Sequence, residues 1–322
     1  MITAPDFRQK QILFLNTYTL GRCNLSFRNE NIVITLHGRI HDKMPIRHLL
    51  AVFIIGEMTL TSQLIRKCMK NGVSLFLLTR TNETYATIGA YAEGNYLLRQ
   101  KQYALSEERM LEIARAIVLH KTINQLALLR SIGVNTIGIR SRSAYKKEVK
   151  EKLAKATDAA TLRGIEGSVS RDFFTAYFSQ IEWYKRVPRG KVDPNNVLLD
   201  MGYTYLFNFV DSLLRVYGFD TYKGMYHRLF FQRKSLSSDV MEPFRCIIDR
   251  ALYKTHTLGQ FRAADFRRAK GKYYLDYQHS HKYAKIFLTE IMRYKEDMYK
   301  YVRSLYYMII NDEGELEQFT IR

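Results

Sequence analysis

Short apolar runs separated by polar turns fill residues 11–91, and this pattern is typical of a β-sheet. Two of the runs, CNLSFR and NIVITL, flank a polar turn at residues 28–31 and predict a hairpin. The run HLLAVFIIG at residues 48–56 is continuously apolar, which predicts a strand buried on both faces. Residues 61–71 carry apolar positions at helical spacing and end before Gly72, a helix stop. We therefore expect a small sheet with at least one helix.

The hydrophobic period changes near Gly94, and from residue 95 onward it is helical almost throughout. Ser106 stands at an expected helix start, and Gly218 follows the last residue of a long apolar helix. We predict an α+β protein of two domains. They are a small β-rich N-terminal domain at residues 1–93 and a larger all-α catalytic domain at residues 107–322, joined by an ordered linker at 94–106.

Charge and aromatic content indicate what such a protein binds. Lys and Arg number 50 against 31 acidic residues, a formal net charge of +19, and the chain has 23 Tyr and 18 Phe. Phosphates attract Lys and Arg while bases and sugars pack on rings, so this composition favours a nucleic-acid-binding protein. The basic run at residues 140–155 fits either a solvated helix face or a DNA-facing one.

Cysteine usage and the N-terminus bear on the compartment. Cys23, Cys68 and Cys246 are odd in number and show no CxxC spacing, which argues against a disulfide framework and a thiolate zinc site. The first residues lack the order of a signal peptide, and no apolar run reaches the roughly 18 residues of a membrane span. We expect a cytoplasmic protein without a membrane partner.

One stretch, GMYHRLFFQRKSLSSDVMEPFR at residues 224–245, combines a histidine with carboxylates. His227 precedes Glu242 by fifteen residues, and Asp239 lies three residues before Glu242. Imidazole nitrogen and carboxylate oxygen together suit Mn²⁺ or Mg²⁺. Glu166, on a predicted helix, is the third anchor that we propose. From the residues alone, a metal site and ordinary structural roles both remain open.

An ordered set of motifs accompanies these residues. GIEG at residues 164–167 precedes a group of aromatics, and DPNN at residues 193–196 precedes Gly202 and Tyr203. His227 follows an aromatic residue and precedes RKSL at 233–236 and DVMEPFR at 239–245. In this order the motifs resemble the CRISPR-associated spacer-acquisition integrase family, the first of the two adaptation Cas proteins. The resemblance covers nearly the whole chain.

The resemblance implies a set of ligands, partners and an assembly. Glu166, His227 and Glu242 would be the ligands of Mg²⁺ or Mn²⁺, with Asp239 as a nearby acidic contributor to catalysis. The implied partners are double-stranded DNA, both as spacer precursor and as repeat array, and a second copy of the chain bound largely through the N-terminal domain. A larger complex with the small second adaptation Cas protein is a further partner that the resemblance suggests.

The implied reaction is transesterification, in which a DNA 3′-hydroxyl attacks a phosphodiester at the edge of a repeat. With water as the attacking group, the same site would be an endonuclease. A tyrosine recombinase would need His-x-x-Arg, which none of the eight histidines provides. The remaining alternative is a non-catalytic DNA-binding scaffold of the adaptation complex.

Two positions depart from the family pattern, because Gln232 replaces a common glycine and Pro243 follows Glu242 where a second glutamate is frequent. Since Pro243 biases Glu242 away from helical angles, we expect Ser237 or Ser238 to cap a helix with Asp239 in its first turn. Basic and hydroxyl side chains along the second half of the chain are the expected DNA contacts: Arg233, Lys234, Ser235, Arg245, Arg267, Arg268, Lys270 and Lys272.

Overall fold

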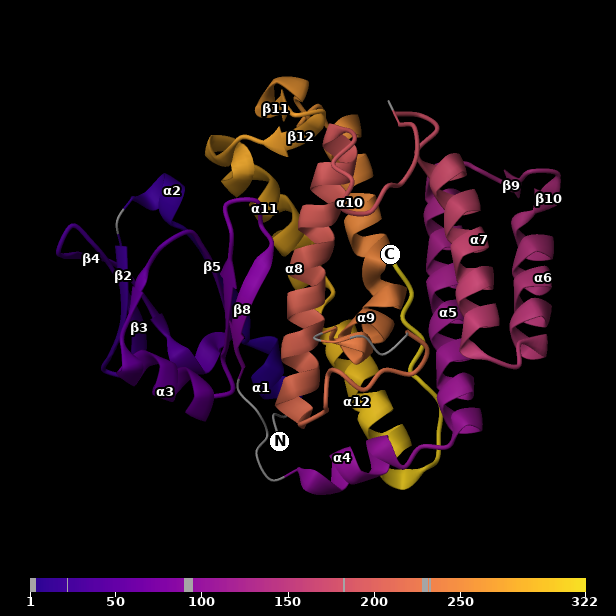
Figure 1. Ribbon diagram of the computed structural model, residues 1–322, viewed down its shortest axis with the longest axis horizontal. Helices are drawn as coiled ribbons and strands as arrows, with labels where there is room; N and C mark the ends of the chain where they lie inside the picture. The colour runs from indigo at the N-terminus through magenta and orange to yellow at the C-terminus, as the bar shows by residue number, and fades with distance from the viewer. Residues whose placement is uncertain (1–3, 22, 90–94, 182, 228–230, 232) are drawn as a thin grey trace.

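The structure is a computed structural model that describes residues 4–21, 23–89, 95–181, 183–227, 231 and 233–322. Figure 1 shows the N-terminal strands at one end of the molecule and the helices α5 (Glu107–Ser131), α6 (Arg142–Lys155) and α7 (Ala159–Tyr177) side by side at the other. The helix α8 (Pro194–Tyr217) stands between them and is buried along most of its length. Among the described residues, no helix has the length and apolar character to cross a membrane.

The N-terminal part contains two four-stranded sheets. One has the strand order β1-β5-β7-β8, in which β8 alone is antiparallel to its neighbour, and the other has the order β4-β3-β2-β6. The elements of this part are α1 (Ala4–Arg8), β1 (Gln11–Asn16), α2 (Thr17–Leu20), β2 (Cys23–Arg28), β3 (Asn31–Leu36), β4 (Arg39–Pro45), η1 (Ile46–His48), β5 (Leu49–Ile55), β6 (Thr59–Leu60), α3 (Ser62–Lys70), β7 (Ser74–Leu78) and β8 (Thr84–Ile88). The predicted hairpin, buried strand and helix are confirmed.

Strand β5 shares its two faces between two hydrophobic cores. Val52 and Ile54 point into the core between the two sheets, which α3 closes with Leu64. The alternate residues Phe53 and Ile55 belong to the large core of the helical part. Because successive side chains of a strand point to opposite faces, every residue of β5 is buried, as its continuous apolar sequence predicted.

The C-terminal part is mainly helical, and its helix ends follow local signals. Arg109 donates its backbone N–H to Ser106 Oγ at 3.1 Å, and Gly218 ends α8 with a φ of 90°, so both predicted caps are confirmed. The other elements of this part are α4 (Tyr96–Tyr103), β9 (Thr136–Ile137), β10 (Arg140–Ser141), α9 (Ser235–Met241), η2 (Glu242–Phe244), α10 (Arg245–Thr257), η3 (Ala263–Asp265), β11 (Phe266–Ala269), β12 (Lys272–Leu275), α11 (Tyr277–Arg293) and α12 (Lys295–Asn311).

The prediction of an all-α C-terminal domain is wrong, because two β-hairpins interrupt the helices. Strands β9 and β10 pair with each other, and so do β11 and β12. The turn of the second hairpin is Lys270 and Gly271, with φ of 50° and 75°, and two positive φ values in succession are what a tight hairpin turn requires. The fold is therefore α+β, with a β-rich N-terminal part and a helical C-terminal part that carries two hairpins.

The predicted division is into residues 1–93, 94–106 and 107–322. Its first boundary, between residues 93 and 94, lies outside the described residues. This division stays a prediction.

Candidate active site

The centre of the candidate active site is a lysine that joins two glutamates from different elements. Lys121 lies on α5, Glu166 on α7 and Glu242 at the start of η2. Lys121 Nζ donates to Glu166 Oε1 and, at 2.7 Å, to Glu242 Oε2. Three segments that are far apart in the sequence therefore meet at one ammonium group.

Glu242 is ionised although it is almost entirely buried. Its side chain is 4% exposed, and Arg245 Nε lies 2.9 Å from Glu242 Oε2. Burial alone would raise the pKa of this carboxyl, but the charges of Arg245 and Lys121 outweigh it and lower the pKa to about 2. Burial would lower the pKa of Lys121, yet Glu166 and Glu242 raise it. Both partners are therefore charged at neutral pH.

Glu166 is the more open of the two glutamates, as its side chain is 21% exposed. Ser170, one turn later on α7, donates to Glu166 Oε1 at 2.9 Å. The flanking Gly164 and Gly167 have no heavy atom within 4 Å of where a Cβ would stand. The surface beside Glu166 is therefore free of side chains from these two positions, and the site meets solvent on this side.

Asp239 organises the segment that carries His227. Its side chain has no exposed surface and accepts backbone N–H groups from Met225, Tyr226 and His227 at 2.5, 3.3 and 3.2 Å. Asp239 Oδ1 also accepts from the ring Nδ1–H of His227. In a neutral ring this contact places the proton on Nδ1 and the lone pair of His227 on Nε2.

Gly224 is required where this segment begins. A Cβ at this position would stand 2.7 Å from Asp239 Oδ2 and 2.7 Å from Ser235 Cβ, so no side chain fits there. The close approach of the backbone to Asp239 thus depends on glycine.

The expected helix cap at Ser237 or Ser238 is wrong. The cap position of helix α9 is Lys234, three residues before Ser237, and the helix begins at Ser235, so Asp239 lies in its second half. Ser237 Oγ instead donates to the buried Asp211 at 2.9 Å. Glu242 keeps helical angles, with φ −55° and ψ −45°, and the helix tightens into η2 at Pro243, where a missing N–H is tolerated. Gln232, the other departure from the family pattern, lies outside the described residues.

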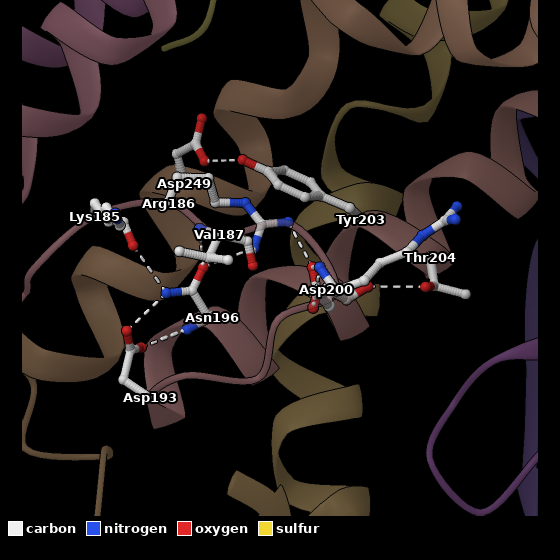
Figure 2. Close-up of polar contacts among 10 residues, drawn as sticks. Lys185, Arg186, Val187, Asp193, Asn196, Asp200, Tyr203, Thr204 and Asp249 are labelled. Carbon is white, nitrogen blue, oxygen red and sulfur yellow. Dashed lines mark hydrogen bonds and ion pairs between the residues drawn. The ribbon is translucent and has the colours of Figure 1, made fainter. Parts of the chain in front are cut away.

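The DPNN motif forms the start of α8. The backbone N–H of Asn196 donates to Asp193 Oδ1 at 2.7 Å, which makes Asp193 the N-cap. Asn196 Oδ1 accepts from Arg186 at 2.9 Å and from the Val187 backbone N–H at 2.8 Å, so the preceding loop is fastened to the helix (Figure 2). The motif therefore positions α8 and the residues that it carries.

Tyr203 links α8 to the glutamate site. The guanidinium of Arg245 lies over its ring, 4.6 Å from the ring centroid. The Tyr203 hydroxyl donates to Asp249 (Figure 2). Asp249 is buried, and burial raises its pKa to about 7. Arg245 is thus held between Glu242 on one side and the Tyr203 ring on the other.

The predicted metal ligands fit a divalent cation by their chemistry, because two carboxylates and a histidine that can offer the lone pair of Nε2 are suitable donors. A protonated His227 ring would add to the lowering of the Glu242 pKa, which places the two side chains near each other. Within the described part of the chain, however, no three His, Cys, Asp or Glu side chains are arranged to hold a metal ion. The position where the two carboxylates converge belongs to Lys121 Nζ.

The expected DNA contacts divide into exposed and buried residues. Arg233 is exposed, and so are the hairpin residues Arg267, Arg268, Lys270 and Lys272. Arg245 belongs to the glutamate site. Lys234 is half-buried and contacts Asp211 at 2.9 Å, whereas Ser235 has no exposed surface. Contact of these residues with DNA stays a prediction.

We did not predict Lys121 from the sequence, although a signal was there. The buried positions of α5 include Ile117, Val118, Lys121, Gln125 and Leu128, which follow each other at helical spacing. A lysine on the apolar face of a helix needs a carboxylate partner, because an unpaired buried charge is costly. This position could have been identified by that argument.

Comparison with known proteins gives a consistent result. The model of the family described as CRISPR associated protein Cas1 matches residues 18–289. A relative from Rhodospirillum rubrum, named CRISPR-associated endonuclease Cas1 2, is 30% identical over 260 residues, which are 75% of this chain and 75% of the relative.

Two solved structures share the fold. A casposase bound to integration product is similar with a TM-score of 0.80 at 20% identity, over 95% of this chain and 92% of that one. A chain of a Cas6-RT-Cas1–Cas2 complex has a TM-score of 0.79 at 24% identity, over 96% of this chain and 36% of that longer one. At these identities the likeness is one of fold.

Proposed function

The chain belongs to the CRISPR-associated protein Cas1 family, and on that premise we propose that it is a DNA integrase and endonuclease of CRISPR adaptation that depends on a divalent metal ion. In this proposal the protein joins new spacer DNA to the repeat array by attack of a DNA 3′-hydroxyl on a phosphodiester. Hydrolysis follows when water takes the place of the hydroxyl.

The observation that supports the proposal is the convergence of Glu166 and Glu242 beside an oriented His227. The two carboxylates share one ammonium group, and Asp239 binds Nδ1 of the imidazole, which leaves Nε2 as the nitrogen for a metal ion. Buried ionised carboxylates are costly to maintain unless a cation is bound close to them. Such a cluster is a candidate for catalysis, because perturbed pKa values concentrate at functional sites.

Glu166, Glu242 and His227 Nε2 would hold the cation. When bound, it supplies neutralisation of charge on the phosphate and activation of the attacking hydroxyl. Asp239 holds the His227 ring, and Arg245 adds positive charge next to Glu242. The new P–O bond forms as the bond to the leaving 3′-oxygen of the repeat breaks, and the proton lost by one oxygen is balanced by the proton gained by the other. The number of phosphodiesters is unchanged, so no external energy is needed.

The proposed partners are double-stranded DNA, a second copy of the chain and the second adaptation protein. The formal charge of +19 supports binding to DNA. The printed title of one structural neighbour, a Cas6-RT-Cas1–Cas2 complex, names Cas2 together with Cas1, and this supports Cas2 as a partner here.

The test is strand joining by the purified protein. A labelled duplex with 3′-hydroxyl ends is incubated with a repeat-containing duplex, with Mn²⁺ or EDTA, in the presence and absence of Cas2. We expect joined product in Mn²⁺ and none in EDTA. Glu166→Ala, His227→Ala and Glu242→Ala should each lose joining. Binding of the duplex should remain in all three, since it rests on phosphate contacts spread over many cations. Duplex binding without joining under every condition would instead support the non-catalytic scaffold.

A further inference from the structure

We propose that Lys121 is the resident counter-cation of the two catalytic carboxylates and that a divalent metal ion must displace its ammonium group to bind. The metal half of this inference rests on the proposed function. The other half, that Lys121 holds the carboxylates together, depends only on the residues of the chain.

The contacts of Lys121 show that one atom holds the site. Its Nζ reaches Glu166 Oε1 on α7 and Glu242 Oε2 on η2, while its own backbone belongs to α5. The side chain is 8% exposed, so water does not screen these ion pairs effectively. Glu242 has a second cation in Arg245, whereas Lys121 is the one cation paired with Glu166 within the described ranges.

Removal of this charge would leave two ionised groups facing each other. Two carboxylates that share a buried site cannot both stay ionised without a nearby positive charge. Arg245 pairs with Glu242, but Lys121 pairs with both carboxylates, so Lys121 is the cation that holds Glu166 and Glu242 close together before any metal ion arrives. The site is assembled in advance, and this lowers the reorganisation that catalysis requires.

The same geometry indicates competition with a metal ion. An ammonium ion and a divalent cation cannot share one buried position, because their repulsion is strong where water is excluded. With Nζ between the carboxylates, the described part of the chain presents no three-ligand metal cluster. A metal ion bound to both glutamates thus requires Nζ to withdraw, which the flexible four-carbon stem of lysine permits. Lys121 would raise the metal concentration at which the site fills.

The experiment uses the full chain with Lys121→Met, which keeps the length of the side chain, and Lys121→Gln, which keeps a hydrogen-bond donor. Lys282→Met is the matched control. Lys282 Nζ lies 2.8 Å from Asp265 Oδ2, and this ion pair is not part of the glutamate site. Thermal unfolding is measured in EDTA and at increasing Mn²⁺, and Mn²⁺ affinity is measured by calorimetry without DNA.

We expect both Lys121 variants to unfold at a lower temperature than wild type in EDTA and to bind Mn²⁺ about tenfold more tightly or better, a difference of about 1.4 kcal/mol. Mn²⁺ should also raise their unfolding temperature more than it raises that of wild type. Lys282→Met should be less stable but keep the wild-type Mn²⁺ affinity.

Weaker or unchanged Mn²⁺ binding in both Lys121 variants would overturn the competition, since Lys121 would then support the metal ion instead of opposing it. If neither variant folds in EDTA, recovery of folded protein on adding Mn²⁺ supports the inference, and failure at every Mn²⁺ concentration overturns it. A wild-type protein that joins strands and binds Mn²⁺ while the variants match its affinity refutes this inference alone. A wild-type protein that binds no Mn²⁺ refutes the metal dependence of the proposed function as well.

Discussion

Asp239 differs from the three proposed ligands because it acts through His227. Its oxygens accept three backbone N–H groups and the His227 ring, and an asparagine could offer only one acceptor oxygen in their place. We expect Asp239→Asn to weaken Mn²⁺ binding or activity about 10- to 100-fold, with partial recovery at higher Mn²⁺.

Glu242→Ala should abolish Mn²⁺-dependent joining at every metal concentration, because it removes a ligand. Metal titrations of both variants check the assignment. A loss in Asp239→Asn that no Mn²⁺ concentration relieves, beside a tolerant Glu242→Ala, would reverse the two roles.

Asp249 gives the stability of the protein a pH dependence of its own. Burial raises its pKa from the ordinary 3.8 to about 7, so between these values the folded protein holds a proton that the unfolded chain has released. Its contribution to stability therefore falls as pH rises toward 7. Asp249→Asn still accepts from Tyr203 but does not titrate. Its free energy of unfolding relative to wild type should therefore rise by about 1.4 kcal/mol for each pH unit over this range.

Urea unfolding of wild type and Asp249→Asn at several pH values between about 4 and 8 measures this difference. A difference between the two proteins that is the same at every pH would show that the Asp249 proton plays no part.

At this scale the sequence reveals the residues with familiar chemistry but not how they are paired. Glu166, His227 and Glu242 could be singled out from their motifs. That Asp239 binds the backbone of residues 225–227 depends on a chain reversal that no motif encodes, and the pairing of Lys121 depends on three elements meeting.

Among the elements, the C-terminal segment after α12 supports η2, the short helix that begins at Glu242. Phe319 packs on Phe244, with ring centroids 5.0 Å apart, and its carbonyl accepts from Asn124 at 3.0 Å. Asn124 Oδ1 also accepts the backbone N–H of Ile321 at 2.8 Å. This segment therefore packs against η2 from the side of α5.

Phe319→Ala should cost about 3 kcal/mol of stability, because it leaves a cavity beside Phe244. Strand joining should fall as well, since η2 positions Glu242. The exposed neighbour Gln318 supplies the control, as Gln318→Ala changes no buried contact. Denaturant unfolding and joining are measured on both variants, and equal stability in the two would show that the segment does not support η2.

The apolar pattern predicted the elements whose burial is regular, such as β5 and α3, and missed those whose environment is mixed. Strand β4 is polar and largely exposed, so it shows no alternation. Apolar positions at helical spacing run through residues 286–310 and predict one helix, but the chain forms α11 and α12, separated at Tyr294 without any glycine or proline to indicate the break. Such boundaries are set by packing.

Across the whole molecule, exposed positive charge sets the response to salt. The β11–β12 hairpin carries Arg267, Arg268, Lys270 and Lys272 on its surface. If they contact phosphates, replacing all four by alanine should lower the slope of log affinity against log salt concentration by about 4, in a fluorescence-anisotropy titration of duplex DNA.

A matched variant tests the basic helix α6. It replaces four exposed residues by alanine: Lys146, Lys147, Lys150 and Lys155. The slope of this variant decides between a solvated face, which leaves it unchanged, and a DNA-facing one, which lowers it equally. An unchanged slope in the hairpin variant would remove β11–β12 from the DNA surface.

Sheet edges bear on assembly, because unpaired strand edges are usually covered. Strand β4 lies at the edge of its sheet and exposes Ile40 at 49%. We expect a homodimer, with light scattering giving twice the chain mass of 37.9 kDa. Ile40→Lys should shift the protein toward monomer if β4 takes part. A wild-type monomer at micromolar concentration would contradict the dimer.

The division of β5 between two cores has a consequence for how the chain can be cut or recombined. Phe53 and Ile55 belong to the core that the helical part shares, where the Phe53 ring lies 5.8 Å from that of Tyr205 on α8. A fragment ending before residue 95 would lose this cover, expose that face of β5 to water and invite aggregation. Exchange of the N-terminal part between homologous proteins would need matched residues on that face of the strand. In a chimera joined at the linker without such matching, β5 would pack poorly against the helical part, far from the junction itself.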